Sequence, residues 1–319
     1  MKVLGFIIVR IGIALFTIFC ISVIVFLAMR MLPGGFETII LGPIQTEEAK
    51  AMITERFGLD RSLPEQFLSW IFAVVKGDFG ISMITQTSVA DELLRRAPAT
   101  IQLALMSVGL ALIIGIPLGI VSGLGNSSDR VKKSGRLVGA LGASTPDFVL
   151  GTMLVYVFSV WSLGLKVGGY VPLSEDFVAN LQAMTLPTIT LSVFGVALIL
   201  RTARDSVLGV MTNGYITTAV ARGDTPHSIV VHHVIRNATP PVLTVTAMYL
   251  STLIGGAVIV ELLFSIPGIG LYTWNALFNR DYVVTQTAVL LFSTVFVTVN
   301  MLVDIAYAIL DPRISASRS

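Results

Sequence analysis

The sequence predicts an all-α membrane protein with six transmembrane helices, and two observations lead to this prediction. Of the 319 residues, 54% are hydrophobic and only 13% are charged, and the mean hydropathy is +0.85. A soluble chain of this length carries about a quarter charged residues. The apolar residues also gather in runs of about 20, the length that a helix rising 1.5 Å per residue needs to cross a bilayer. Most of the surface is therefore expected to face lipid.

Six apolar runs reach this length. The first run carries no charge, and Lys2 and Arg10 precede it. We interpret it as a span and not as a cleaved signal peptide, because it is too long and no small-residue cleavage site follows it. In the fourth run, the charge-free part ends before Arg201. The predicted spans are residues 11–29, 99–123, 137–160, 186–206, 241–264 and 284–310.

The basic residues are distributed unevenly between the predicted loops. If the N-terminus is cytoplasmic, the cytoplasmic segments hold 12 Lys and Arg residues, whereas the two short loops on the other side hold only Lys166 and Arg280. The long stretch between the first two spans counts little in the positive-inside rule. This distribution predicts that both termini are cytoplasmic. The 12 residues are Lys2, Arg10, Arg130, Lys132, Lys133, Arg136, Arg201, Arg204, Arg222, Arg236, Arg313 and Arg318.

The stretch between the first two spans, residues 31–98, contains helix signals of its own. Ser62 and Glu65 have the spacing of a capping box, in which each side chain bonds the backbone N–H of the other residue. The segment is either a small structured loop on the membrane surface or a wall for a docked partner, and the sequence leaves both readings open. The expected helices cover residues 46–58, 62–75 and 88–97.

Motifs for catalysis and for metal binding are absent from the sequence. It contains no Gly-x-x-x-x-Gly-Lys-Ser/Thr nucleotide-binding loop and no Gly-x-Ser-x-Gly. The three histidines, His227, His232 and His233, lack a Glu at zinc-protease spacing. The single cysteine, Cys20, excludes an internal disulfide and a cysteine metal cluster. We therefore predict a chain that is not an enzyme and binds no metal or cofactor. The net charge of +2 gives no indication of a nucleic-acid partner.

The predicted cytoplasmic loop, residues 201–240, has helical character. Breaks are expected at Gly214 and at Gly223. Thr225 and Pro226 are typical of a helix cap and a first helical position. A short helix, a glycine turn and a second helix at a membrane face would form a rigid knob that can transmit force to a soluble partner. An ordinary helical hairpin is the alternative.

This loop resembles the cytoplasmic signature of permeases in binding-protein-dependent ABC importers. The strict signature is Glu-Ala-Ala, three residues and Gly, and its first two letters are replaced here by Thr217 and Thr218. The fuller form found in dipeptide and oligopeptide permeases agrees better, although Gly214 stands where an acidic residue usually precedes the tyrosine. The residues that match the fuller form are Tyr215, Thr218, Ala219, Ala221, Arg222, Gly223, Arg236, Asn237, Ala238 and Pro241.

The resemblance extends over nearly the whole chain through short motifs. Each motif is weak alone, but their order and spacing together are specific to this family of permeases. The motifs lie at residues 32–34, 57–60, 77–82, 98–100, 116–119, 144–148, 260–261, 267–270, 302–304 and 311–313.

The resemblance implies a type I ABC importer permease in the bacterial inner membrane. Such a subunit would pair with a second homologous permease and bind two ATPase subunits, which carry the ATP and Mg, while an extracytoplasmic solute-binding protein delivers the solute. We divide the chain into residues 1–98, with the first span and an extracytoplasmic helical region, and a five-helix core of residues 99–319. The expected ATPase-coupling residues are Tyr215, Thr217, Thr218, Ala219, Arg222, Gly223 and Asp224.

Four polar residues inside the predicted spans are candidates for the pathway or a gate, because such groups are costly in lipid. Asp147 either caps a helix that restarts there or faces the pathway. Glu261 either holds the neighbouring loop, residues 267–270, or meets a substrate amine. Asn300 and Asp304 share one helix face and are expected to form interhelical hydrogen bonds.

The substrates implied by the resemblance are dipeptides or oligopeptides. Nickel or a metal chelate is an alternative, since residues 278–282 (Phe-Asn-Arg-Asp-Tyr) resemble the nickel branch of these permeases. A secondary transporter driven by an ion gradient is an alternative from another class. Six spans with no evident inverted repeat and few buried charges argue against it. A stand-alone channel would have no use for a docking knob.

Overall fold

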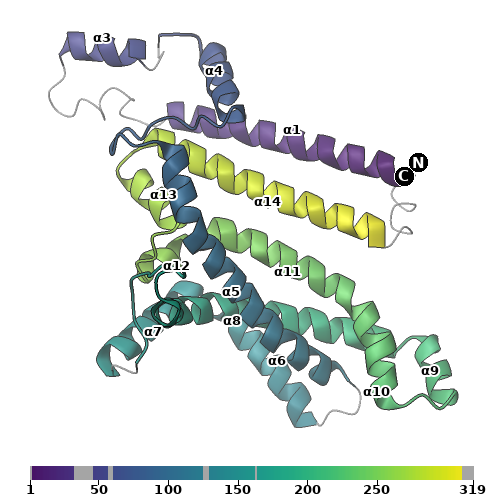
Figure 1. Ribbon diagram of the computed structural model, residues 1–319. Coiled ribbons are helices and arrows are strands. Elements are labelled where there is room, and N and C mark those ends of the chain that lie inside the picture. Colours follow the sequence, from purple (N-terminus) through teal and green to yellow (C-terminus); the bar gives the residue numbers. More distant parts are fainter. Residues whose placement is uncertain (1, 32–45, 57–59, 125–128, 162–163, 311–319) are drawn as a thin grey trace.

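The computed structural model describes residues 2–31, 46–56, 60–124, 129–161 and 164–310, and helices dominate them (Figure 1). The motifs at residues 32–34 and 311–313 and most of that at 57–60, including Gly58, lie outside this part of the chain. The longer helices are α1 (Lys2–Arg30), α3 (Glu47–Arg56), α4 (Leu63–Val75), α5 (Val89–Gly123), α6 (Asp129–Ser144), α7 (Asp147–Trp161), α8 (Phe177–Met211), α9 (Gly214–Ala221), α11 (Arg236–Gly256), α12 (Val258–Leu263), α13 (Ile269–Phe278) and α14 (Tyr282–Leu310).

Four of these helices, α1, α5, α8 and α14, are long and apolar enough to cross a membrane. A fifth span results if the bent pair α6–α7 is counted as one crossing. The chain is therefore an all-helical polytopic membrane protein, but the described helices give four or five candidate spans where the sequence predicted six.

The predicted third span, residues 137–160, is not a straight helix. It is broken between α6 and α7, whose apolar parts meet at 94°. Pro146 lies at the break, and proline both lacks a backbone donor and disfavours helical geometry in the residue before it. Pro146 is evident in the sequence, but a span predicted from the length of an apolar run does not include the bend that a proline causes.

The predicted fifth span, residues 241–264, is also divided. Helix α11 ends at Gly256 and the short α12 follows, so the run is two helices and not one. Pro240, Pro241 and several threonines dilute the apolar residues of α11, which explains why α11 alone is not among the candidate spans.

Two predicted elements are longer than expected. The helix expected over residues 88–97 and the second span are one helix, α5, which continues through Pro98 and Pro117. Membrane helices tolerate proline where other groups satisfy the freed carbonyl. The predicted fourth span is α8, which begins nine residues earlier, at Phe177, and continues past Arg201 to Met211.

Helices α5 and α8 form the centre of the molecule, and three glycines of α5 allow their close approach. Gly115, Gly119 and Gly123 recur every fourth residue and so lie on one face of the helix. A Cβ added at Gly119 would lie 2.5 Å from the Cβ of Ala203 and 2.8 Å from the carbonyl oxygen of Leu200. Small residues at this spacing bring the backbones of membrane helices into contact.

Helices α6 and α11 pack directly on α8, whereas α1 is joined to this core mainly through α14. Helix α1 packs chiefly on α14, and the two run side by side in opposite directions (Figure 1). The start of α1, the end of α14 and helix α9 lie toward the same end of the molecule, whereas α3, α4 and α13 lie toward the other end. The helix expected from the capping box is α4, which ends at Val75 as predicted, and the Glu65 carboxylate accepts the Ser62 N–H at 3.1 Å.

The glycine contact gives a prediction with a built-in control. Gly119→Ala places a methyl group against α8, and overpacking of this kind costs about 1–3 kcal/mol. Gly109→Ala lies on the same helix with no atom within 4 Å of the added Cβ, and removing a helical glycine gains about 1 kcal/mol. In mild detergent, the unfolding midpoint should fall for Gly119→Ala and stay level or rise for Gly109→Ala. Equal midpoints would contradict the contact.

Candidate functional site

The knob predicted for residues 201–240 is built from α9 and a sharp turn that follows it. After α9, Gly223 adopts a φ of +91°, a left-handed conformation that glycine tolerates without strain. The Gly223 N–H donates to the carbonyl of Val220, and the Asp224 N–H donates to that of Ala219. This is the Schellman motif, which satisfies the carbonyls at the end of a helix. Gly223 is therefore required by geometry at the position where the family signature has its glycine.

A second helical segment follows the turn. Thr225 accepts a hydrogen bond from the Ser228 N–H at 3.3 Å, and Pro226 is the first residue of the short helix α10 (Pro226–Ser228). The cap and first turn expected here are confirmed. The segment then continues as a π-helix, η1 (Ile229–Ile235), which leads into α11. The sequence did not predict the π-helix.

An apolar seat fixes the knob to the transmembrane helices. Ile216 and Ala219 of α9 are buried against residues of η1 and of the end of α8. This cluster also includes Ala238, near the start of α11, so its buried members come from four elements. The buried members are Val207, Val210, Ile216, Ala219, Ile229, Val234 and Ala238.

The other side of α9 is open. Of the predicted coupling residues, Tyr215, Thr217, Thr218, Arg222 and Gly223 are exposed. Ala219 differs, because it is buried in the seat. Asp224 is half-buried.

The histidines of this region lie beside the knob. His233 Nε2 lies 3.8 Å from an Asp224 carboxylate oxygen, and the His233 ring is 6.1 Å from the ring of Tyr215. In the described part of the chain, no group of three or more His, Cys, Asp or Glu side chains is positioned to hold a metal ion.

Glu261 is completely buried and bonds the start of α13. Its carboxylate accepts the Thr100 hydroxyl at 2.6 Å and the Leu271 N–H at 2.8 Å. The Thr100 hydroxyl in turn accepts the Ile269 N–H at 2.9 Å. A Cβ added at Gly268 would overlap the carboxylate. A negative group at the first turn of a helix bonds its free amides and interacts favourably with its dipole.

Asp147 is the first residue of α7, directly after the bend. The first amides of this helix, those of Val149 and Leu150, donate to the carbonyl of Pro146. Within the described residues, the Asp147 carboxylate forms no hydrogen bond, so the capping bond expected from the sequence is not observed.

Asn300 and Asp304 lie near the end of α14, and they differ in their contacts. The Asn300 amide donates to the carbonyl of Phe296, within its own helix, at 2.8 Å. Asp304 pairs with Arg10 of α1 at 2.9 Å. Of these two residues, Asp304 therefore joins two helices, whereas the interhelical hydrogen bond expected for Asn300 is not observed.

One further buried carboxylate escaped the sequence reasoning. Asp281, which directly precedes α14, accepts the Ser82 hydroxyl at 2.5 Å and thereby ties the segment before α5 to the start of α14. Nearby, the Arg96 guanidinium lies 4.8 Å from the ring centre of Tyr272. Burial, with the charges of Asp281 and Glu92, raises the pKa of Tyr272 to about 12. The sequence offered one signal for this contact: Ser82 lies in the motif of residues 77–82, and Asp281 lies in that of residues 278–282.

Two family models together match almost the entire chain. Residues 115–316 match the model described as "Binding-protein-dependent transport system inner membrane component". Residues 3–104 match the N-terminal model of the membrane component of the same transport systems.

Curated relatives agree with these matches. A protein of Sinorhizobium fredii, named "Probable peptide ABC transporter permease protein", is 37% identical over 294 residues, which are 92% of this chain and 94% of the relative. The glutathione transport system permease protein GsiC of Escherichia coli is 35% identical over 300 residues, or 93% of this chain and 94% of the relative.

A solved structure supports the fold. A chain from inward-facing MetNI, a methionine ABC transporter, superposes with a TM-score of 0.54 and covers 71% of this chain and 96% of its own length. It is 19% identical, so the likeness concerns the fold alone. The family models and the two relatives decide the identity: this chain belongs to the binding-protein-dependent transport system inner membrane components and is a non-catalytic permease subunit of an ABC importer.

Proposed function

We propose that this permease imports peptides, including peptides of the size of glutathione. The two relatives described above match more than nine-tenths of the chain and are named as a peptide permease and a glutathione permease. Their names support peptides over the nickel or metal-chelate alternative. Membership in a family of binding-protein-dependent importers excludes the transporter driven by an ion gradient.

The complete importer would contain a second homologous permease, two ATPase subunits with their ATP and Mg, and an extracytoplasmic solute-binding protein. This chain would supply no cofactor and bind no nucleic acid. Reconstitution of that complex in liposomes tests the substrate: ATP-dependent uptake should occur with a dipeptide or glutathione and not with nickel. Uptake of nickel alone would replace the peptide assignment.

The exposed side of α9 is the proposed docking surface for one ATPase subunit. The observation that carries this proposal is the combination of an open face, which includes Tyr215 and Arg222, with a buried seat on the end of α8. Such a knob is rigid and is fixed to a long helix. Movement of the ATPase would therefore be passed directly to α8.

We infer six crossings, with both termini cytoplasmic. The bent pair α6–α7 and the pair α11–α12 would each cross the bilayer in two pieces. The start of α1 and the end of α14 lie toward the same side as α9 (Figure 1), which supports the orientation that the basic residues predict. In this arrangement residues 1–98 form a peripheral unit and residues 99–319 form the core.

Glu261 and Asp304 are proposed to hold helices together and not to bind substrate. Glu261 is saturated by bonds to α5 and α13, and Asp304 is paired with α1. Asp147 makes no such bond, and it remains the candidate for the pathway among these residues.

Reversal of one charge on the knob tests the docking surface. Arg222→Glu should reduce the amount of ATPase that co-purifies with the permease in mild detergent, since Arg222 is exposed there. The same reversal at Arg136, an exposed residue of α6, is the matched control and should leave the ATPase bound. Equal retention in both variants would place the docking surface elsewhere.

The turn can be tested separately from the contact. Gly223→Ala forces a side chain into the left-handed region, which costs about 1–2 kcal/mol. Gly214→Ala changes a residue at the other end of α9 that does not have a positive φ. ATP-driven uptake should decrease only for Gly223→Ala. Unchanged uptake would show that this turn is not needed for coupling.

The Glu261 network is tested at Thr100. Thr100→Val removes the hydroxyl, leaves the Ile269 N–H without a partner, and should cost about 1–3 kcal/mol. Thr100→Ser retains the hydroxyl and should behave like the natural protein. The unfolding midpoints in detergent provide the measurement. A Thr100→Ser midpoint as low as that of Thr100→Val would show that the methyl group, and not the hydroxyl, matters.

A further inference from the structure

Helix α4 is apolar, yet none of its residues is buried. Leu68, Phe72 and Val75 expose 50%, 61% and 78% of their surface. Their spacing of four and three residues places them on one face of the helix. A contiguous apolar face of this kind, on a folded protein, marks a contact with lipid or with another protein.

The depth of α4 can be read from α1, on which it packs. Arg10 and Arg30 of α1 are 20 residues apart, which corresponds to about 30 Å along the helix. This equals the thickness of the hydrocarbon core, so the two arginines mark its two edges. Arg10 has the ion pair with Asp304 at one edge, and Arg30 ends the span at the other.

Aromatic contacts fix α4 well inside the Arg30 edge. The ring centre of Phe67 is 5.4 Å from that of Phe26 and 6.0 Å from that of Phe19, and Trp70 stacks on Phe26 at 6.0 Å. Phe26 and Phe19 precede Arg30 by four and eleven residues, or by about 6 and 16 Å. Helix α4 therefore packs on a part of α1 that lies within the hydrocarbon.

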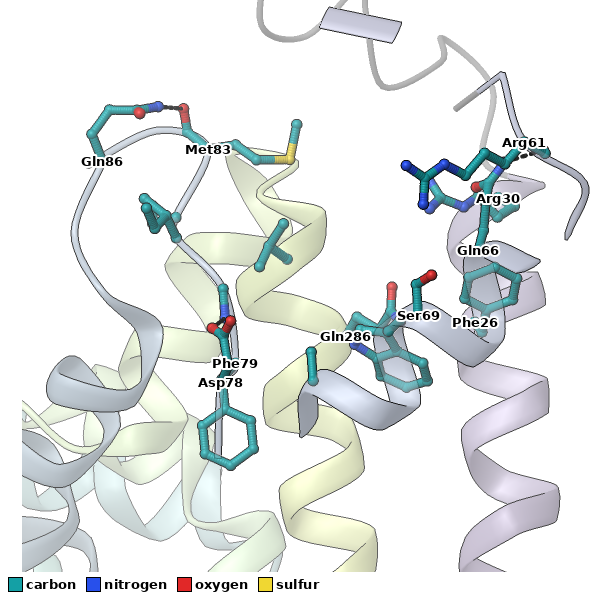
Figure 2. Close-up of a pocket in the computed structure, with 16 residues that line it drawn as sticks. Phe26, Arg30, Arg61, Gln66, Ser69, Asp78, Phe79, Met83, Gln86 and Gln286 are labelled. Atoms are coloured by element: carbon teal, nitrogen blue, oxygen red, sulfur yellow. Dashed lines mark hydrogen bonds between the residues drawn. The ribbon is translucent and has the colours of Figure 1, made fainter. Parts of the chain in front are cut away.

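The polar side of α4 faces a different environment. Gln66 and Ser69 line a cavity of about 510 Å³ between α1, α4 and the segment before α5, and Arg30 and Arg61 lie together at its rim (Figure 2). Asp78, the acidic residue of this cavity, is on the opposite wall. One side of α4 is thus polar and the other apolar, as in helices that lie in a membrane interface.

We propose that α4 is embedded in the leaflet nearest to Arg30, with lipid acyl chains covering Leu68, Phe72 and Val75. Arg61, just before the helix, lies at the level of the lipid phosphates. Its side chain is exposed and forms no ion pair within the described residues, so its guanidinium can donate to a phosphate. The leaflet is the outer one if the proposed orientation holds, but the embedding itself does not depend on that orientation.

Acyl chains fit this face better than a second protein does. Helix α1, on which α4 packs, also exposes large apolar side chains: Phe16 and Ile24 expose 67% and 64% of their surface. A helix also satisfies its own backbone groups, and this is the condition for contact with hydrocarbon. At the start of α4, the Glu65 carboxylate of the capping box accepts the Ser62 N–H.

Spin labels in the reconstituted importer test the proposal. Cys20 is first replaced by Ala, and single cysteines are introduced at Leu68, Phe72, Arg61 and Ser69 for labelling. Collision rates with oxygen, which dissolves in hydrocarbon, and with a water-soluble nickel chelate are then measured. The oxygen-to-nickel ratio should be severalfold higher at positions 68 and 72 than at 69, with 61 between them. Peptide uptake by each labelled complex confirms that it is assembled.

Two results would overturn the proposal. Labels at positions 68 and 72 that are reached by neither reagent would mean that protein covers this face. Labels reached mainly by the nickel chelate would mean that water does. The fluorescence of Trp70 gives a second measurement that needs no label on α4. The variant Trp161→Phe, Trp274→Phe leaves Trp70 as the one tryptophan of this chain. Lipids brominated on the acyl chains should quench the fluorescence of Trp70 in this variant. Absence of quenching would count against the embedding.

Discussion

The close contact between α5 and α8 is the constraint on which the rest of the molecule depends. Gly119 lets the two backbones meet near Ala203, and both helices extend from there to the two ends of the protein. One end of α5 carries Thr100 and its network with α13. The far end of α8 carries the seat of the knob. A helix of 35 residues such as α8 is about 52 Å long, so a single rigid element reaches from one network to the other.

Several motifs that lie far apart in the sequence contact one another in the folded chain. Thr100, Glu261 and Ile269 belong to three different motifs, and one hydrogen-bonded network contains them all. Ser82 and Asp281 meet in the same way. The spacing of these motifs along the chain reflects contacts in space, which explains why each motif alone carries so little information.

Part of this structure could be predicted from the sequence, and physical reasons explain the remainder. Long apolar runs predicted α1 and α14, and the turn residues predicted α4 and the knob, because these signals are local. The bend at Pro146 and the division of the fifth run at Gly256 lie inside apolar runs of sufficient length, and a criterion of length and composition does not detect such breaks. Ala219 was grouped with exposed coupling residues, but it is buried, because only the packing of α9 on η1 decides which face is covered.

The ion pair between Arg10 and Asp304 has a consequence for biosynthesis. The two residues are separated by almost the entire chain, so α1 leaves the ribosome first and its main partner α14 leaves last. At 5–20 residues per second, about 15–60 s pass between the two events. Throughout that interval, α1 must remain in the bilayer without α14, the helix on which it chiefly packs. The first span therefore has to insert and persist independently of the core that it finally joins.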